Sequence, residues 1–82
     1  MEYNNAFLVL GERYRQLRTD RGMIQEDVLE HNFSVRHYQQ LEAGRPHSLQ
    51  TFFRLCKMFK VTPEDLIKGA LDGHNGSRKR KK

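Results

Sequence analysis

The feature that most constrains the fold is the segment from Gln25 to Gly44, QEDVLEHNFSVRHYQQLEAG, in which two helical stretches are separated by a very short break. Asn32, Phe33 and Ser34 form the break. Asparagine tolerates the left-handed conformation that ends a helix, and serine is a favourable N-cap for the next one. Phe33 and Tyr38 have the spacing of a hydrophobic staple, which fixes the angle between chain and helix. The segment therefore predicts two short helices and a tight turn: Gln25 to His31, then Val35 to Ala43.

The second of these helices has one apolar side and one polar side. At about 100° per residue, Tyr38 and Leu41 fall together on the apolar side. Arginine and glutamine are suited to the edges of guanine and adenine in a DNA major groove. The polar side is either an ordinary solvated face or a surface that reads bases. Its residues are Arg36, Gln40 and Ala43, flanked by His37 and Gln39.

Three further helices are predicted on either side of this segment. The first runs from Phe7 to about Arg21, where apolar residues recur at three- and four-residue spacing, and Gly22 ends it. After a loop at residues 45–47, Ser48 can cap a helix whose apolar stripe continues to Phe59. The last helix begins with Thr62 as cap and Pro63 in the first helical position. The stripe of the fourth helix and the apolar residues of the fifth are Leu49, Phe52, Leu55, Cys56 and Phe59, then Leu66, Ile67 and Leu71.

The charge is concentrated at one end of the chain. The 82 residues carry a net charge of +5, and the last five residues, all lysine or arginine, account for it. Residues 6–71 are expected to form one helical domain, because no strand-like alternation or internal repeat is present. Residues 72–82 are expected to be a flexible basic tail, either solvated or bound nonspecifically to the DNA backbone. In a eukaryotic host the same run could serve as a nuclear-localisation signal, which is the less favoured alternative. The cations of this tail are Arg78, Lys79, Arg80, Lys81 and Lys82.

Several classes of protein are excluded as expectations. The apolar runs are too short to span a membrane, and no secretory leader is recognised, so a cytoplasmic protein is expected. The single cysteine, Cys56, is expected in the core. No metal or other cofactor is expected, because the four histidines lack ligand spacing. Catalysis is not expected either, since no nucleophile is paired with a base and no glycine loop could hold phosphate.

Several short motifs together resemble the Cro/repressor class of helix-turn-helix proteins, also called the XRE family. The resemblance covers about Leu10 to Ile67 and implies an all-α, five-helix, lambda-repressor-like fold that binds double-stranded DNA. The motifs that carry it are Leu10-Gly11-Glu12-Arg13, Leu17-Arg18, Gly22-Met23, Gln25-Glu26, Gln40-Leu41-Glu42-Ala43-Gly44 and Ser48-Leu49-Gln50-Thr51.

The resemblance also implies roles for individual residues. Gln25 would bond a DNA phosphate and brace the following helix, and residues 34–40 would face the major groove. Arg18 and Glu42 match an internal ion pair of the family, whose loss of one partner is costly. Val35 would either touch a thymine methyl group or cover the turn. The expected DNA contacts are Gln25, Ser34, Val35, Arg36, His37, Gln39 and Gln40, with Arg45 and His47 on the backbone.

The chain departs from the family pattern in two places. Ile24 stands where the family has a capping side chain, which removes about 1 kcal/mol of helix stabilisation. The segment between the second and third helices is also shorter than usual and lacks the customary glycine, so Asn32 is expected to take the turn position.

The apolar residues near the C-terminal helix exceed what one small core requires. The resemblance implies a two-fold homodimer at this end, whereas the alternative is that the same residues close the core of a monomer. The candidate interface residues are Phe59, Val61, Ile67 and Leu71. The function expected is a sequence-specific transcriptional regulator, a repressor, with the helix at 35–43 in the major groove. The alternative is a protein-interaction module, such as an antitoxin-like partner-binding protein with secondary DNA binding.

Overall fold

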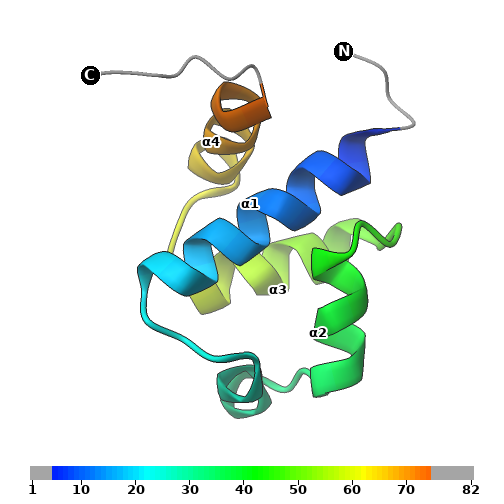
Figure 1. The fold of residues 1–82 in the computed structure, drawn as a ribbon, viewed down its shortest axis with the longest axis vertical. Helices are drawn as coiled ribbons and strands as arrows, with labels where there is room; N and C mark the ends of the chain where they lie inside the picture. Colours follow the sequence, from blue (N-terminus) through cyan, green and yellow to red (C-terminus); the bar gives the residue numbers. More distant parts are fainter. Residues whose placement is uncertain (1–4, 75–82) are drawn as a thin grey trace.

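The computed structural model describes residues 5–74, which form five helices and no strand. The prediction of an all-α fold is therefore confirmed, and none of these helices has the length and hydrophobicity needed to cross a membrane. The helices are α1 (Ala6–Asp20), the 3₁₀ helix η2 (Gln25–His31), α2 (Val35–Glu42), α3 (Leu49–Phe59) and α4 (Pro63–His74) (Figure 1).

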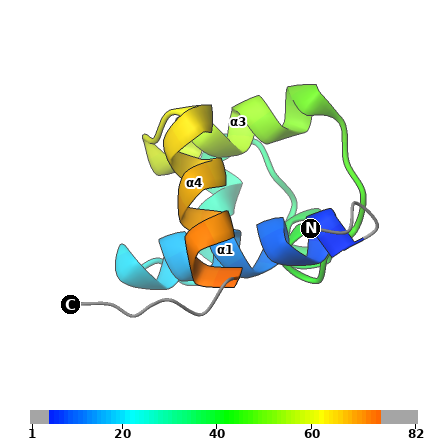
Figure 2. The same cartoon turned by 90° about the horizontal axis from the view of Figure 1, so that it is seen from above.

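Helix α1 is the central element, and it packs against α2, α3 and α4. Viewed from above, α1 and α3 lie on opposite sides of the molecule and α4 crosses between them at one end (Figure 2). Helix η2 packs against α2 and lies at the far edge from α4 (Figure 1). This arrangement leaves α2 at the periphery, with one side toward the core and the other open.

Every helix contributes to one hydrophobic core. Tyr14 of α1 and Tyr38 of α2 are fully buried, and burial raises the pKa of both phenols above its usual range, so both stay neutral. The Tyr38 hydroxyl donates a hydrogen bond to the backbone carbonyl of Tyr14 at 3.4 Å. Cys56 is buried in the core, as the apolar stripe of α3 predicts. The other largest fully buried side chains are Val28, Leu41, Leu55, Phe59 and Leu66.

Four of the helices end in the same way, with one residue in the left-handed conformation. In this Schellman motif, two backbone N–H groups beyond the helix bond carbonyls of its last turn. At the end of α2, for example, the N–H groups of Gly44 and Arg45 donate to Leu41 and Gln40 at 3.1 and 3.0 Å. The left-handed residues are Gly22 (φ 67°), Asn32 (φ 67°), Gly44 (φ 95°) and Lys60 (φ 59°). The turn position predicted for Asn32 is thereby confirmed.

Three of the helices begin at the hydroxyl caps that the sequence predicts. The side-chain oxygens of Ser34, Ser48 and Thr62 accept the N–H groups of His37, Thr51 and Asp65 at 3.0, 3.1 and 3.0 Å. Helix η2 begins at Ile24, which has no side-chain acceptor, but the Asp27 carboxylate accepts the Ile24 N–H at 2.9 Å. Half of a capping box therefore replaces the missing cap.

The structure differs from the sequence prediction in the winding of one helix and the end of another. Residues 25–31 form a 3₁₀ helix, whose three residues per turn bury Val28 but leave Leu29 exposed. Helix α4 continues to His74, so the domain boundary expected after Leu71 falls inside this helix. The rest of the expected tail, residues 75–82, lies outside the described residues.

Gly11 allows α1 to approach the end of α2 very closely. A Cβ atom at this position would lie 2.5 Å from the backbone oxygen of Glu42 and 2.8 Å from that of Leu41. Backbone atoms cannot rotate away as a flexible side chain can, so only hydrogen fits there. The residue at position 11 therefore determines how closely α2 is held to the core.

We predict that Gly11→Ala destabilises the protein by about 1 to 3 kcal/mol, because the methyl group forces α1 and α2 apart. Helix propensity alone would favour alanine by about 1 kcal/mol. The variant is therefore less stable than the parent only if the clash outweighs this gain. Denaturant unfolding measures the difference. Gly22→Ala is the control, since its methyl group meets no atom within 4 Å and costs only the left-handed backbone, about 1 kcal/mol. A Gly11→Ala protein at least as stable as the parent would contradict the prediction.

Candidate nucleic-acid interface

Helix α2 separates its buried and exposed residues as its periodicity predicts. Tyr38 and Leu41 are 0% and 1% exposed, and they attach the helix to the core. The opposite side is open to solvent. We call this side the α2 face and define it by Arg36, Gln39 and Ala43, which are exposed, and Gln40, which is half-buried.

The first turn of α2 is stabilised by contacts within the protein. Ser34 remains exposed, although its hydroxyl accepts the His37 N–H as a helix cap. The His37 ring lies 5.9 Å from the ring of Phe33, and Tyr38 lies 6.4 Å from the same ring. The staple predicted between Phe33 and Tyr38 is therefore formed. Val35 is half-buried beside this turn.

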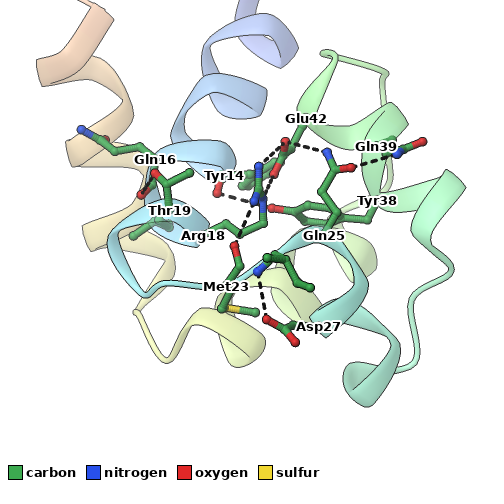
Figure 3. A network of polar contacts seen from close by, with 12 residues as sticks. Tyr14, Gln16, Arg18, Thr19, Met23, Gln25, Asp27, Tyr38, Gln39 and Glu42 are labelled. Carbon is green, nitrogen blue, oxygen red and sulfur yellow. Dashed lines mark hydrogen bonds and ion pairs between the residues drawn. The ribbon is translucent and has the colours of Figure 1, made fainter.

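A chain of hydrogen bonds connects the α2 face to α1 (Figure 3). The Gln39 amide donates to the Gln25 side-chain oxygen at 2.8 Å, and the Gln25 amide donates to the Glu42 carboxylate at 3.4 Å. Glu42 in turn accepts from Arg18, which also donates to the carbonyl of Met23 at 2.9 Å. Gln25 thus braces α2 through Gln39, as the family resemblance implies.

The ion pair of Arg18 and Glu42 is the most buried charged contact in the described chain. Their nearest atoms, Nε and Oε2, are 2.6 Å apart, and the side chains are only 13% and 7% exposed. The hydrogen bond to Glu42 raises the pKa of the Arg18 guanidinium, although burial acts in the opposite direction. The pair joins the last turn of α1 to the last residue of α2.

The loop after α2 separates two residues that were expected to act together on the DNA backbone. Arg45 is exposed. His47 instead has protein partners at both ring nitrogens: the carbonyl of Arg45 at 2.9 Å from Nδ1 and the hydroxyl of Tyr14 at 2.8 Å from Nε2. A carbonyl only accepts, so Nδ1 carries the proton and Nε2 accepts from the phenol.

The structure thus gives His47 partners within the protein that the sequence did not predict. Its ring packs 5.1 Å from that of Phe7 and 5.6 Å from that of Tyr14, between the α2–α3 loop and α1. We assign His47 to the anchoring of this loop. Of the two residues, Arg45 is the one whose side chain is exposed to solvent.

The expected dimer residues are also corrected in part. Phe59 is fully buried, and Val61 is half-buried against the core, because α4 folds over the end of α3. Ile67 and Leu71 remain exposed on α4 at 44% and 37%, and on α3 Leu49 and Phe53 are exposed at 65% and 50%. Leu49 belongs to the apolar stripe that the sequence predicts for α3, but it is not buried with the rest of that stripe. We call Leu49, Phe53, Ile67 and Leu71 the apolar surface.

Leu49 and Ile67 lie on the same crevice, which connects the α3 and α4 parts of the apolar surface. It has a volume of about 260 Å³ and is lined by residues of α1, α3, α4 and the loop before α3. The side chains from α1 are Phe7 and Leu10. The i, i+4 spacing of Leu49 and Phe53 is the sequence signal from which a second apolar stripe on α3 could have been recognised.

A larger groove, of about 640 Å³, lies between α1 and α4. Its lining includes Leu8, Arg13 and Gly69 but no residue of η2 or α2, so it is separate from the α2 face. The Arg13 guanidinium packs directly against Gly69, and burial lowers the pKa of this arginine.

Comparison with known proteins does not identify the chain. No family model, no curated protein and no solved structure matches it. The resemblance to the Cro/repressor class thus remains a prediction from short motifs.

We predict that Glu42→Ala lowers the free energy of unfolding by about 3 to 5 kcal/mol, because it leaves the Arg18 guanidinium buried without its partner. Glu42→Gln keeps two polar atoms at the same place and is expected to cost less. Guanidinium or urea unfolding of both variants measures the difference. Glu12→Ala is the matched control: it removes an ion pair with Arg15 whose side chains are 73% and 53% exposed, and pairs of this kind contribute little. Equal stability of the Glu12→Ala and Glu42→Ala proteins would contradict the prediction.

Proposed function

We propose that the chain is a sequence-specific DNA-binding regulator of transcription, acting as a repressor, with η2 and α2 as a helix-turn-helix and α2 in the major groove. The observation that carries the proposal is the α2 face. Arg36 is exposed at the start of a helix whose opposite side is fully buried, so the helix presents its polar groups in one direction. A cytoplasmic location at the nucleoid follows from this proposal.

The chemistry of the α2 face suits base edges. An α-helix fits the major groove, where arginine pairs with the N7 and O6 atoms of guanine and glutamine pairs with adenine. We assign guanine contact to Arg36 and adenine contact to Gln40. The Gln39 amide nitrogen donates a hydrogen bond to the side-chain oxygen of Gln25 (Figure 3). The side-chain oxygen of Gln39 is not used in this bond. That oxygen can accept from the amino group of a base.

The phosphate contacts follow from the ends of η2 and α2. The Gln25 amide has two hydrogens, and Glu42 takes one of them at 3.4 Å, so the second can bond a phosphate oxygen. Arg45 leaves α2 in a direction set by the left-handed Gly44, and its exposed guanidinium can pair with the backbone. Arg78 to Lys82 would add nonspecific attraction that weakens with salt.

One observation favours a second candidate function, a protein-interaction module such as an antitoxin-like partner. Beside α2, helix η2 exposes Leu29 at 58%, and Ile24 before it is 60% exposed. The same helix exposes the carboxylates of Glu26 and Glu30, which DNA phosphates repel. Apolar and acidic groups side by side suit a protein partner better than DNA.

The apolar surface is proposed as the interface of a homodimer. We predict that the parent chain sediments as a dimer at micromolar concentration, and that Ile67→Glu converts it to a monomer, because a buried charge without a partner opposes association. Lys68→Glu, at the adjacent exposed position of α4, is the control. On DNA the dimer should protect two half-sites about 34 to 36 Å apart. A parent protein that is monomeric and binds one half-site at full strength would contradict the dimer.

We predict that Arg36→Ala weakens binding to the selected DNA by about 1 to 3 kcal/mol and binding to random DNA much less, because it removes a contact to a base edge. The DNA is first selected from a pool of random sequences with the parent protein. Fluorescence titrations at several salt concentrations then measure both affinities. Arg15→Ala is the charge-matched control on the exposed side of α1.

Deletion of Arg78 to Lys82 completes the comparison. It should weaken binding to selected and random DNA equally and reduce the salt dependence. If the deletion abolishes discrimination while Arg36→Ala leaves it intact, α2 does not read the bases. If no sequence is selected and a co-purified protein binds at nanomolar concentration instead, the interaction module replaces the regulator.

A further inference from the structure

The turn between η2 and α2 is held weakly by its own backbone. The two N–H groups that close it, those of Asn32 and Phe33, are 3.3 Å from the carbonyls of Leu29 and Val28. These are long hydrogen bonds, and the 3₁₀ helix before them has poorer hydrogen-bond geometry than an α-helix. Asn32 also adopts the left-handed conformation without the freedom of a glycine. The direction in which α2 leaves this turn therefore depends on contacts from elsewhere.

Arg54 of α3 supplies such contacts to two successive residues of the turn. Its Nη2 atom donates to the backbone oxygen of Asn32 at 2.7 Å, the shorter range of charge-assisted hydrogen bonds. Its Cζ atom lies 4.3 Å from the centre of the Phe33 ring, over the ring face. One half-buried guanidinium thus holds both the end of η2 and the residue before the cap of α2.

The Phe33 ring transmits this contact to α2. It is only 2% exposed and lies against the rings of His37 and Tyr38, both in the first turns of α2. A rotation of Phe33 would therefore shift the start of the helix, where Arg36 is located. Bidentate hydrogen bonds to a base require donor and acceptor within about 2.7 to 3.2 Å, so a small shift is enough to break them.

We propose that Arg54 is a positioning residue, which sets the direction of α2 and thereby the discrimination between DNA sequences without touching a base. The inference rests on the proposed function of α2. A planar guanidinium can stack on a ring and donate to a carbonyl at the same time, whereas the compact lysine ammonium offers no plane to stack. The contact replaces the rigidity that the short turn does not supply itself.

The experiment uses Arg54→Met, which keeps the apolar stem, and Arg54→Lys, which keeps the charge. Arg21→Met is the matched control, because Arg21 also donates to a carbonyl, that of Phe59 at 3.1 Å, and lies over the Phe59 ring at 5.9 Å. It does so away from the turn. Hydrogen exchange of backbone amides and titration of selected and random DNA are measured for each full-length protein.

In Arg54→Met we expect the hydrogen-bonded amides of Phe33, His37 and Tyr38 to exchange about tenfold faster, the loss expected for one charge-assisted hydrogen bond. The amides of α1 and α4 should be unchanged. The ratio of affinities for selected and random DNA should fall about tenfold, while affinity for random DNA equals that of Arg21→Met. Arg54→Lys should lose most of the discrimination although its charge is kept.

Three results would overturn the inference. Faster exchange across all helices would show a general loss of stability, and equal weakening on both DNAs would show a phosphate contact. Full discrimination in Arg54→Lys would show that charge alone is enough. If the parent protein selects no DNA sequence, the proposed function fails, and the role in discrimination fails with it. The exchange pattern then decides separately whether Arg54 holds the turn.

Discussion

The carboxylate of Glu42 is the contact on which the rest of the structure depends. This carboxylate accepts hydrogen bonds from Arg18 of α1 and from Gln25 of η2, and Glu42 itself is the last residue of α2. At the same place, the backbone of Glu42 touches α1 at Gly11, so closely that no side chain fits between them. Three elements that are separate in sequence are therefore fixed relative to one another at one residue.

The energetic value of this contact lies in its geometry more than in net stabilisation. Removing a carboxylate and a guanidinium from water costs several kcal/mol, which their attraction offsets only when the hydrogen bonds are satisfied. Here the Arg18 guanidinium also bonds the carbonyl of Met23, and the remaining carboxylate oxygen accepts from Gln25. A satisfied pair of this kind favours one arrangement of α1, η2 and α2 over others, because each alternative leaves a buried charge without a partner.

The two ends of α2 are held by different means. At its C-terminal end are the Glu42 contact, the Schellman motif at Gly44 and the loop anchored by His47. At its N-terminal end are the Ser34 cap, the Phe33 staple and the guanidinium of Arg54. With both ends fixed and the back buried, the α2 face can present Arg36 and Gln40 at constant spacing. The proposal that α2 reads DNA requires such rigidity, because hydrogen bonds to bases tolerate little displacement.

Local signals in the sequence determined where the helices begin and end. The caps at Ser34, Ser48 and Thr62 and the left-handed residues Gly22, Asn32 and Gly44 act within a few residues, so their chemistry can be recognised without a fold. Lys60 was not recognised, since lysine has no preference for the left-handed conformation that it adopts.

The tertiary structure decided which of the predicted side chains are exposed to solvent and which are buried or bonded within the protein. An apolar stripe does not tell which of its residues another helix will cover, so Leu49 proved exposed and Phe59 buried. His47 and Arg54 find their partners 33 and 22 residues away, at Tyr14 and Asn32. Such contacts depend on how α1 and α3 pack against the chain between them, and no periodicity or local propensity encodes that packing.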